Sequence, residues 1–363
     1  LISMLASGYS PIIPAHIDPN ELRTKAIGTG PFKLKSYQPD QLIELEKNPD
    51  YFVKGRPYLD GITYTVIKDR QARAAALIAG QIDILFPQEA PPQVRDQVKG
   101  AVPQMVVHTV AQSAYYNIVV NTTRPPFDNL KIRQAINYAM DRSAFLKTQL
   151  GGAVAAGVIL PAPYSPWGLS AAELKKLPGW GDPAKDKAQA RKLLAEAGYG
   201  PNNPLKVKVS TRSTPLYQDM AVWAIAELKE VGIEGTLDVV ESSLWFPKLA
   251  RKDFELGANM TGAGAEDPDA NLFENFQCGS PRNYSGYCNT EVDALMEKMS
   301  QETDKKKRLV LVHEVDKRVQ LEGARAMLGH ALDFQMNWPY VKGYVPHHSI
   351  YSYGRMQDVW LDK

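Results

Sequence analysis

Residues 205–240 read LKVKVSTRSTPLYQDMAVWAIAELKEVGIEGTLDVV, and they place the chain in the α/β class. The first of them, Leu205–Val209, alternate apolar and charged side chains, which is typical of a half-buried strand. A helix is expected over 216–231, ending before Gly232, and a second strand over 237–240. A strand, a helix and a strand in this order predict two parallel strands joined by a right-handed crossover.

The carboxyl ends of these strands are the expected ligand edge, because parallel sheets bind ligands in the loops that follow their strands. Ser210 to Arg212 ends the first strand, and residues 241–245 follow the second. A third strand is expected over 254–260, and a long loop, Asn259 to Asn289, follows it. We therefore expect three segments to converge at one edge of the sheet.

The loop from Asn259 to Asn289 carries small and turn-forming residues and both cysteines of the chain. A long structureless segment inside a domain is typical of a functional loop. Cys278 and Cys288 suggest one disulfide that closes a short loop, with two unrelated thiols as the alternative. Such a bond would persist in an oxidising compartment. Zinc is not expected, because the spacing is not C-x-x-C and no histidine is near.

Composition describes a globular protein without a strong charge of either sign. The chain has 363 residues, 44% hydrophobic and 23% charged, so it can form a sizeable core in about two or three domains. Its net charge of +2 argues against nucleic acid or an anionic membrane as the main partner. The sequence has no apolar run of about 18 residues that would predict a membrane span.

The first residues, Leu1 to Pro14, are apolar but lack the basic region of a signal peptide and are interrupted by Gly8 and Pro11. We do not interpret them as a signal peptide. Because the chain begins with leucine, we expect a fragment or a processed product.

Complete metal-binding and catalytic motifs are missing from the sequence. Residues 313–317 begin like the helix of a zinc protease, but a lysine stands where the second histidine is needed. Asp267, Asp269 and Asn271 match the first ligands of a calcium loop, whereas the later glycine and glutamate positions hold leucine and cysteine. No G-x-S-x-G elbow or Walker A run is present. We expect no metal and no cofactor.

Glu266 with Asp267 or Asp269 has the composition of a general acid–base pair. Acidic residues beside a proline more often cap helices and turns. Hydrolysis at this acidic loop is therefore kept as the alternative function.

The rest of the chain alternates strands and helices. Further strands are expected over 32–37, 42–46, 62–67, 81–85, 115–121 and 325–334. Further helices are expected over 70–79, 132–140, 183–197, 291–300 and 305–320. Asp69 and Thr290 can cap the helices that follow them.

Motifs spread along nearly the whole chain match one family in order. They are G-T-G-P-F at 28–32, N-P-D-Y-F at 48–52, P-F-D-N at 126–129, I-R-Q-A-I at 132–136, the helix over 182–198 and D-P-D at 267–269. With them the chain resembles the extracytoplasmic solute-binding proteins of family 5, the dipeptide-, oligopeptide- and nickel-binding type that serve ABC importers. Family members begin well upstream, so the chain resembles their C-terminal two-thirds.

The resemblance implies a two-lobed, type II periplasmic-binding-protein-like fold, with mixed sheets flanked by helices and a ligand cleft between the lobes. Residues 1–111 would be part of lobe I, 112–328 lobe II and 329–363 the return to lobe I. Ligand binding would shift a hinged open form toward a closed form that docks on the permease subunits in the membrane. The implied location is periplasmic or extracytoplasmic, and we expect a monomer that binds no nucleic acid.

The resemblance also implies ligand-binding residues. In peptide-binding members a carboxylate shortly before the D-P-D motif pairs with the amino group of the peptide. Here Ala263 or Gly264 stands where that aspartate is expected, and Glu266 would substitute if the loop turns it inward. The full set of expected residues is Arg212, Trp245, Thr261, Gly262, Ala263, Gly264, Glu266, Asp267, Asn283 and Tyr284.

Two of these residues have an alternative interpretation. Arg212 lies near the position where some members bind a ligand carboxylate, which suits the forked guanidinium, but it is also explained as a surface arginine at a strand end. Trp245 matches an aromatic position of the family and would line the pocket, or it belongs to the core.

The implied function is the substrate-binding component of an ABC importer that captures a short peptide or a peptide-like compound. A non-peptide solute, such as an opine, an oligosaccharide or a metal chelate, is the alternative ligand. A ligand-sensing receptor on the same fold is a third possibility, and the hydrolase is the alternative of another class.

Overall fold

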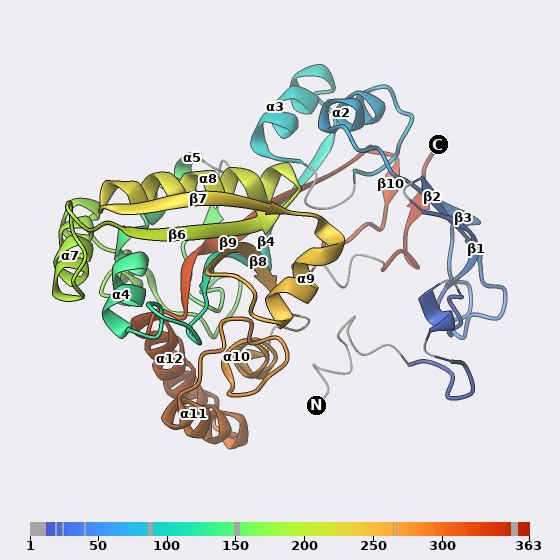
Figure 1. Ribbon diagram of the computed structural model, residues 1–363. Helices are drawn as coiled ribbons and strands as arrows, with labels where there is room; N and C mark the ends of the chain where they lie inside the picture. The colour runs from blue at the N-terminus through green and yellow to red at the C-terminus, as the bar shows by residue number, and fades with distance from the viewer. Residues whose placement is uncertain are drawn as a thin grey trace. The chain divides into compact units, whose positions relative to one another are not determined.

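The computed structural model describes residues 12–18, 20–23, 25–39, 41–85, 90–148, 153–263, 265, 267–349 and 355–363. The chain divides into two compact units, which we call the first unit (1–110 with 333–363) and the second unit (111–332). It passes between them within two long strands, β4 (Val106–Val120) and β9 (Arg325–Asn337) (Figure 1). The sequence placed these divisions after residues 111 and 328.

The first unit contains a three-stranded antiparallel sheet in the order β1-β2-β3. Its described elements are η1 (Glu21–Arg23), β1 (Phe32–Gln38), β2 (Leu42–Lys47), β3 (Gly61–Thr65), α2 (Arg70–Ile78), α3 (Pro92–Ala101), β10 (Val341–Lys342) and β11 (Trp360–Leu361). Asp69 caps α2 as expected, accepting the N–H of Ala72 at 2.8 Å. The strand expected over 81–85 is wrong, because this segment makes only an isolated bridge between Ile84 and Asn337.

The second unit is built on a six-stranded mixed sheet in the order β5-β9-β4-β8-β6-β7. The strands not yet defined are β5 (Ala153–Val154), β6 (Leu205–Arg212), β7 (Ile233–Val240) and β8 (Leu256–Gly262). β6 runs parallel to β7 and to β8, and α8 (Pro215–Glu230) connects β6 to β7, so the predicted crossover of parallel strands is confirmed. β4 and β8 pair antiparallel, which makes the sheet mixed as expected.

Helices cover both faces of this sheet, and Figure 1 shows α8 on one side and α10–α12 on the other. Because successive side chains of a strand point to opposite faces, Tyr115 and Tyr116 of β4 enter different cores. One core includes α8 and the other includes the helices that follow β8. The helices of this unit are α4 (Leu130–Ala139), α5 (Arg142–Thr148), α6 (Ala171–Leu174), α7 (Pro183–Glu196), α9 (Ser242–Ala250), α10 (Pro268–Phe276), α11 (Thr290–Gln301) and α12 (Lys305–Leu321).

Two segments that the sequence predicted as loops contain helices. α9 follows β7 directly, and α10 occupies the middle of the 259–289 segment. Asp267 caps α10 and Pro268 takes its first position, where a proline loses no helical hydrogen bond. The cap of α11 is Asn289, one residue before the expected Thr290, and its side chain accepts the N–H of Glu291 at 2.9 Å.

Candidate ligand pocket

A pocket of the second unit lies at the N-terminal end of α10. It is bordered by β4, β8, β9, α10 and the segment 159–165, which come together only in the folded sheet. The described residues that line it are Ser113, Ile159, Leu160, Ser165, Ala263, Ala265, Asp267, Asn271 and His330. Three of them, Ala263, Ala265 and Asp267, belong to the short segment that the sequence singled out as facing a ligand.

Strand pairing places Ala263 at this pocket. In the register of β4 and β8, Ala114 lies opposite Gly262, and the N–H of Ala263 donates to the carbonyl of Ser113 at 3.4 Å. The Ser113 hydroxyl in turn donates to the carbonyl of Ala263 at 3.3 Å. Ala263 is buried, so it contributes a methyl group to the lining.

Asp267 is held at the pocket by an arginine of α12. Its Oδ1 accepts Nη2 of Arg308 at 2.6 Å, and its Oδ2 accepts Nη1 of the same residue at 3.2 Å. Oδ1 also accepts the N–H of Asp269 at 3.1 Å. Burial alone would raise the pKa of Asp267, but the Arg308 hydrogen bond, the Asp269 N–H and the charge of Arg308 together hold it below its usual value. This carboxyl group is therefore an anion at neutral pH.

Arg308 has further partners that fix its guanidinium. Nη2 donates to Oδ1 of Asp269 at 3.0 Å, and Oδ2 of that aspartate accepts the hydroxyl of Ser300 at 2.7 Å. The guanidinium carbon lies 5.0 Å from the ring centroid of Trp167, within the range of a cation–π contact. Burial lowers the pKa of Arg308, but Asp267 and Asp269 outweigh it and raise that pKa above the ordinary value.

His330 contributes an uncharged ring to the pocket. Its Nδ1 lies 3.0 Å from the carbonyl oxygen of Gln112 and its Nε2 lies 3.1 Å from that of Gly157. Burial lowers the pKa of His330 to about 4, although the two carbonyl groups act in the opposite direction. The imidazole is therefore neutral at pH 7 and donates to one of the two carbonyls.

The lining segment is anchored from behind by a buried carboxylate of α12. The N–H of Val158 donates to Oδ1 and Oδ2 of Asp316 at 3.1 and 3.2 Å, and Nε2 of Gln320 donates to Oδ1 at 2.7 Å. Burial raises the pKa of Asp316 to about 6, against the effect of these donors. A Cβ atom on Gly157 would lie 2.6 Å from both carboxylate oxygens and from Nε2 of Gln320, so a larger residue here would displace these side chains. Ile159 and Leu160 of the pocket follow directly.

Thr261 and Gly262, expected to contact ligand, are buried residues of β8 beneath the pocket. The Thr261 hydroxyl accepts Nη1 of Arg325 at 2.9 Å and Nδ2 of Asn117 at 3.1 Å. Burial lowers the pKa of Arg325, which also donates to backbone carbonyls. The geometry gives Thr261 a role in the polar network that supports β8.

Arg212 ends β6, at the strand edge where the sequence predicted it. Its Nη2 donates to Oδ1 of Asn259 at a long 3.4 Å, and within the described part of the chain its buried Nε has no hydrogen-bond partner. The guanidinium carbon lies 4.0 Å from the ring centroid of Tyr217 and 5.0 Å from that of Phe246. The charge is therefore held between two aromatic rings with hydrogen-bonding capacity to spare.

Other residues that the sequence assigned to the ligand are buried and contact the protein itself. Trp245 is fully buried with Val119, Leu249 and Phe254, so the core interpretation describes it, and its Nε1 donates to Asn259 at 3.1 Å. Tyr284 packs in the same cluster. Buried Asn283 donates from Nδ2 to two carbonyls of its own loop, at 2.7 and 3.0 Å. The expected roles of Gly264 and Glu266 stay predictions, because both residues lie outside the described ones.

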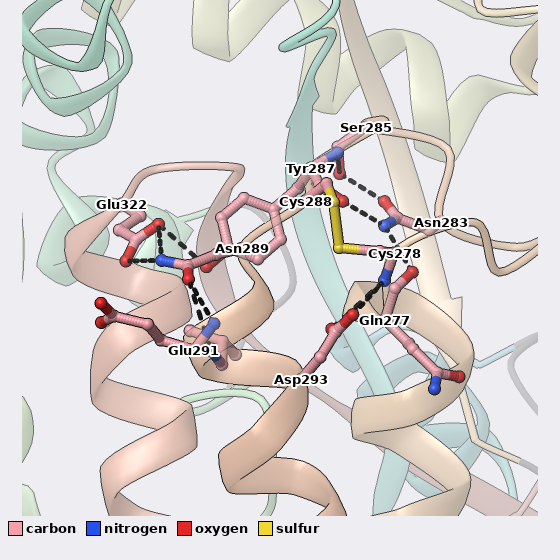
Figure 2. Close-up of a disulfide and its surroundings, with 11 residues drawn as sticks. Gln277, Cys278, Asn283, Ser285, Tyr287, Cys288, Asn289, Glu291, Asp293 and Glu322 are labelled. Atoms are coloured by element: carbon pink, nitrogen blue, oxygen red, sulfur yellow. Dashed lines mark hydrogen bonds between the residues drawn. A yellow bond between two sulfur atoms is a disulfide. The ribbon is translucent and has the colours of Figure 1, made fainter.

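The far end of the same segment is closed by the disulfide between Cys278 and Cys288, which confirms the expected pairing (Figure 2). The N–H of Cys278 donates to both carboxylate oxygens of Asp293 at 3.2 Å. On the other side, Nδ2 of Asn289 donates to Oε1 of Glu322 at 2.9 Å, and Oε2 of that residue accepts the Tyr287 hydroxyl at 2.9 Å. These bonds attach the loop to α11 and to the end of α12.

Several residues of the pocket were not found from the sequence. His330, Ser113 and Asn271 lie on β9, β4 and α10, and a local pattern does not show that strand pairing will bring them together. A signal existed for His330, which is a polar residue inside the buried strand predicted over 325–334. In the sequence Asn271 only matches an early position of an incomplete calcium loop, whereas in the structure its Nδ2 donates to the carbonyl of Val158 at 3.0 Å.

The described residues offer neither a metal-binding cluster nor a membrane-spanning helix. These residues contain no group of three or more His, Cys, Asp or Glu side chains placed to hold a metal ion. None of the helices they form has the length and apolar character to cross a membrane. The pocket instead combines hydroxyl, amide and imidazole groups with aliphatic side chains, which suits non-covalent binding of a polar organic molecule.

Comparison with known proteins places these features among binding proteins. Residues 1–283 match the family model of bacterial extracellular solute-binding proteins, family 5 Middle. The chain is 31% identical over 369 residues to heme-binding protein A of Haemophilus influenzae and 27% identical over 354 residues to the probable di/tripeptide-binding protein 5 of Pseudomonas aeruginosa. These matches cover 99% and 94% of this chain but 64% and 65% of the relatives.

A solved structure has the same fold. The oligopeptide-binding protein AppA of Bacillus subtilis, in complex with a nonapeptide, matches with a TM-score of 0.80 and 27% identity. The match covers 95% of this chain and 69% of that protein.

Proposed function

The chain belongs to the bacterial extracellular solute-binding proteins of family 5, and we propose that it is the substrate-binding component of an ABC importer. In this proposal it captures a short peptide or a peptide-like compound by hinge closure and delivers it to the permease in the membrane. It acts as a monomer, in the periplasm or an equivalent extracytoplasmic space. The two units correspond to parts of the two lobes, and the second unit carries the pocket.

The pocket at α10 is the observation that carries this proposal. Its lining includes three residues of the segment that the resemblance assigns to ligand binding, and it offers hydrogen-bonding groups beside aliphatic ones. Peptide groups need such mixed surroundings, because a buried amide without a hydrogen bond costs several kcal/mol. A relative named for di- and tripeptides and a solved relative that holds a nonapeptide support a peptide-like ligand.

We assign Arg212 to a ligand carboxylate. It has one long hydrogen bond and no ion pair among the described residues, whereas Arg308 is saturated by two aspartates. A guanidinium in this state can bind a carboxylate through two parallel N–H donors. Arg212→Gln is expected to weaken binding of tri-alanine about 10- to 100-fold, since hydrogen bonds to charged groups contribute roughly 1.5–3 kcal/mol.

Calorimetry with two peptides tests this assignment. The effect should be confined to tri-alanine, and C-terminally amidated tri-alanine should bind the variant and the unchanged protein alike. The exposed Arg251, in the same unit, provides the matched control variant Arg251→Gln. Equal losses for both peptides would contradict the assignment.

Native mass spectrometry of the purified protein tests the function itself. We expect an intact small solute to co-purify and to be displaced by a peptide mixture. Cleavage products in that mixture would instead favour the hydrolase that the acidic loop first suggested. A co-purified solute without peptide character would support the importer function and show that its ligand is not a peptide.

A further inference from the structure

Among the described residues of the pocket, the charge comes from one ion pair, between Asp267 and Arg308. Asp267 is the only carboxylate among the described residues that line the pocket, and both of its oxygens accept hydrogen bonds from Arg308. Oδ1 accepts a second bond, from the N–H of Asp269, so only Oδ2 keeps a free lone pair. The carboxylate therefore has little capacity left for a ligand.

The position of Asp267 reduces its attraction for cations further. It is the N-cap of α10, where the unpaired N–H groups and the helix dipole place partial positive charge. The guanidinium of Arg308, which also pairs with the partly exposed Asp269 at 3.0 Å, adds positive charge 2.6 Å from Asp267. The positive end of the helix and the guanidinium both act against the negative charge of Asp267.

The other described residues of the lining are uncharged. Ser113, Ser165 and Asn271 carry neutral polar groups, and the ring of His330 is neutral at pH 7. Ala263 contributes a methyl group, and Ile159 and Leu160 contribute aliphatic surface. Among the described lining residues, an ammonium group that lost its water would find no counter-ion besides the already paired Asp267, and an unpaired buried charge costs more than a hydrogen-bonded neutral group.

We propose that Arg308 determines the specificity of this pocket by neutralising Asp267, so that the pocket accepts an uncharged end of the ligand, such as an acylated or amide-blocked amino terminus, instead of a free ammonium. This inference rests on the proposed function and names the class of ligand within it. Arg308 acts through Asp267 and is a positioning residue. Its stacking on Trp167 and its bond to Asp269 hold the guanidinium in place.

A matched pair of peptides tests the inference by calorimetry on the full chain. N-acetyl-tri-alanine should bind at least 10-fold more tightly than tri-alanine, which has the same length and a free amino group. Arg308→Gln should reduce or reverse this preference, because the carboxylate of Asp267 becomes available to an ammonium group. The control is Arg318→Gln on the same helix, whose partner is Glu291 at 3.3 Å, and it should leave the preference unchanged.

A second variant keeps the test valid if Arg308→Gln does not fold. Ala263→Asp adds a carboxylate directly to the lining and should raise the affinity for tri-alanine while lowering it for the acetylated peptide. If the unchanged protein prefers tri-alanine and Glu266→Gln removes that preference, the pocket recognises an ammonium through Glu266 and the inference is wrong. If neither peptide binds any variant, the peptide function itself fails, and the inference fails with it.

Discussion

Asp267 lines the pocket and Asp316 holds the backbone at Val158, next to the lining residue Ile159, and the two carboxylates are stabilised by different means. Asp267 sits at the pocket edge and meets a guanidinium, which holds its pKa below the usual value. Asp316 lies behind the lining, is 1% exposed and accepts only amide donors in the described structure, so burial raises its pKa to about 6. A neighbouring cation therefore keeps a carboxylate charged in acid, whereas neutral donors position it without securing its charge.

The largest effect that we expect is a change of the unfolding free energy with pH, with opposite signs for the two carboxylates. A carboxyl group whose folded pKa is raised contributes stability that is complete below its unfolded pKa and is lost as the pH rises through the folded pKa. For Asp316 this window runs from about pH 4 to about pH 6. The unfolding free energy of the unchanged protein, relative to Asp316→Asn, should therefore be about 2–3 kcal/mol higher at pH 4 than at pH 7.

Asp267 should show the opposite sign. Its folded pKa is lowered, so its contribution is present above the unfolded pKa and is lost as the pH falls through the folded value. Relative to Asp267→Asn, the unchanged protein should lose stability below about pH 4. The measurement is urea unfolding at a series of pH values, compared between variants, because the depressed pKa of His330 itself removes stability as the pH falls from about 6.5 to about 4. Stability differences that change with pH in the same direction for both aspartates would show that Arg308 does not set the charge of Asp267.

A smaller loss of stability is expected when the backbone at Val158, beside the pocket, loses its bond to Asp316. Asp316→Ala removes the acceptor of the Val158 N–H and of the Gln320 side chain, and leaves buried donors without partners. A loss of about 2 kcal/mol at pH 7 is expected, measured by urea unfolding. Glu314→Ala, at an exposed position of the same helix, should change stability by less than about 0.5 kcal/mol. A loss as small as that in Asp316→Ala would show that the backbone of this segment needs no anchor.

The sequence predicts the scaffold of the site better than the pocket itself. Alternation in β6, the Gly232 stop and the cysteine pair are local signals, and each led to a correct element or bond. α10 was missed because Pro268 and small neighbours are typical of a loop, although they equally describe the capped first turn of a helix. Ser113 and His330 meet through strand register and backbone carbonyls, and these pairings are set by the whole sheet.

The smallest effect that we expect is the loss of stability on removing the charge of Asp269, the second aspartate that pairs with Arg308. Asp269 lies outside the pocket, is 31% exposed and also accepts the Ser300 hydroxyl, a bond that asparagine can keep. Asp269→Asn should therefore cost about 0.5 kcal/mol or less, as expected for a partly exposed ion pair. It should also leave the preference for N-acetyl-tri-alanine unchanged, because Asp267 stays paired. A change of that preference in calorimetry would show that Asp269 orients the guanidinium, and that the pocket depends on the whole cluster instead of on one pair.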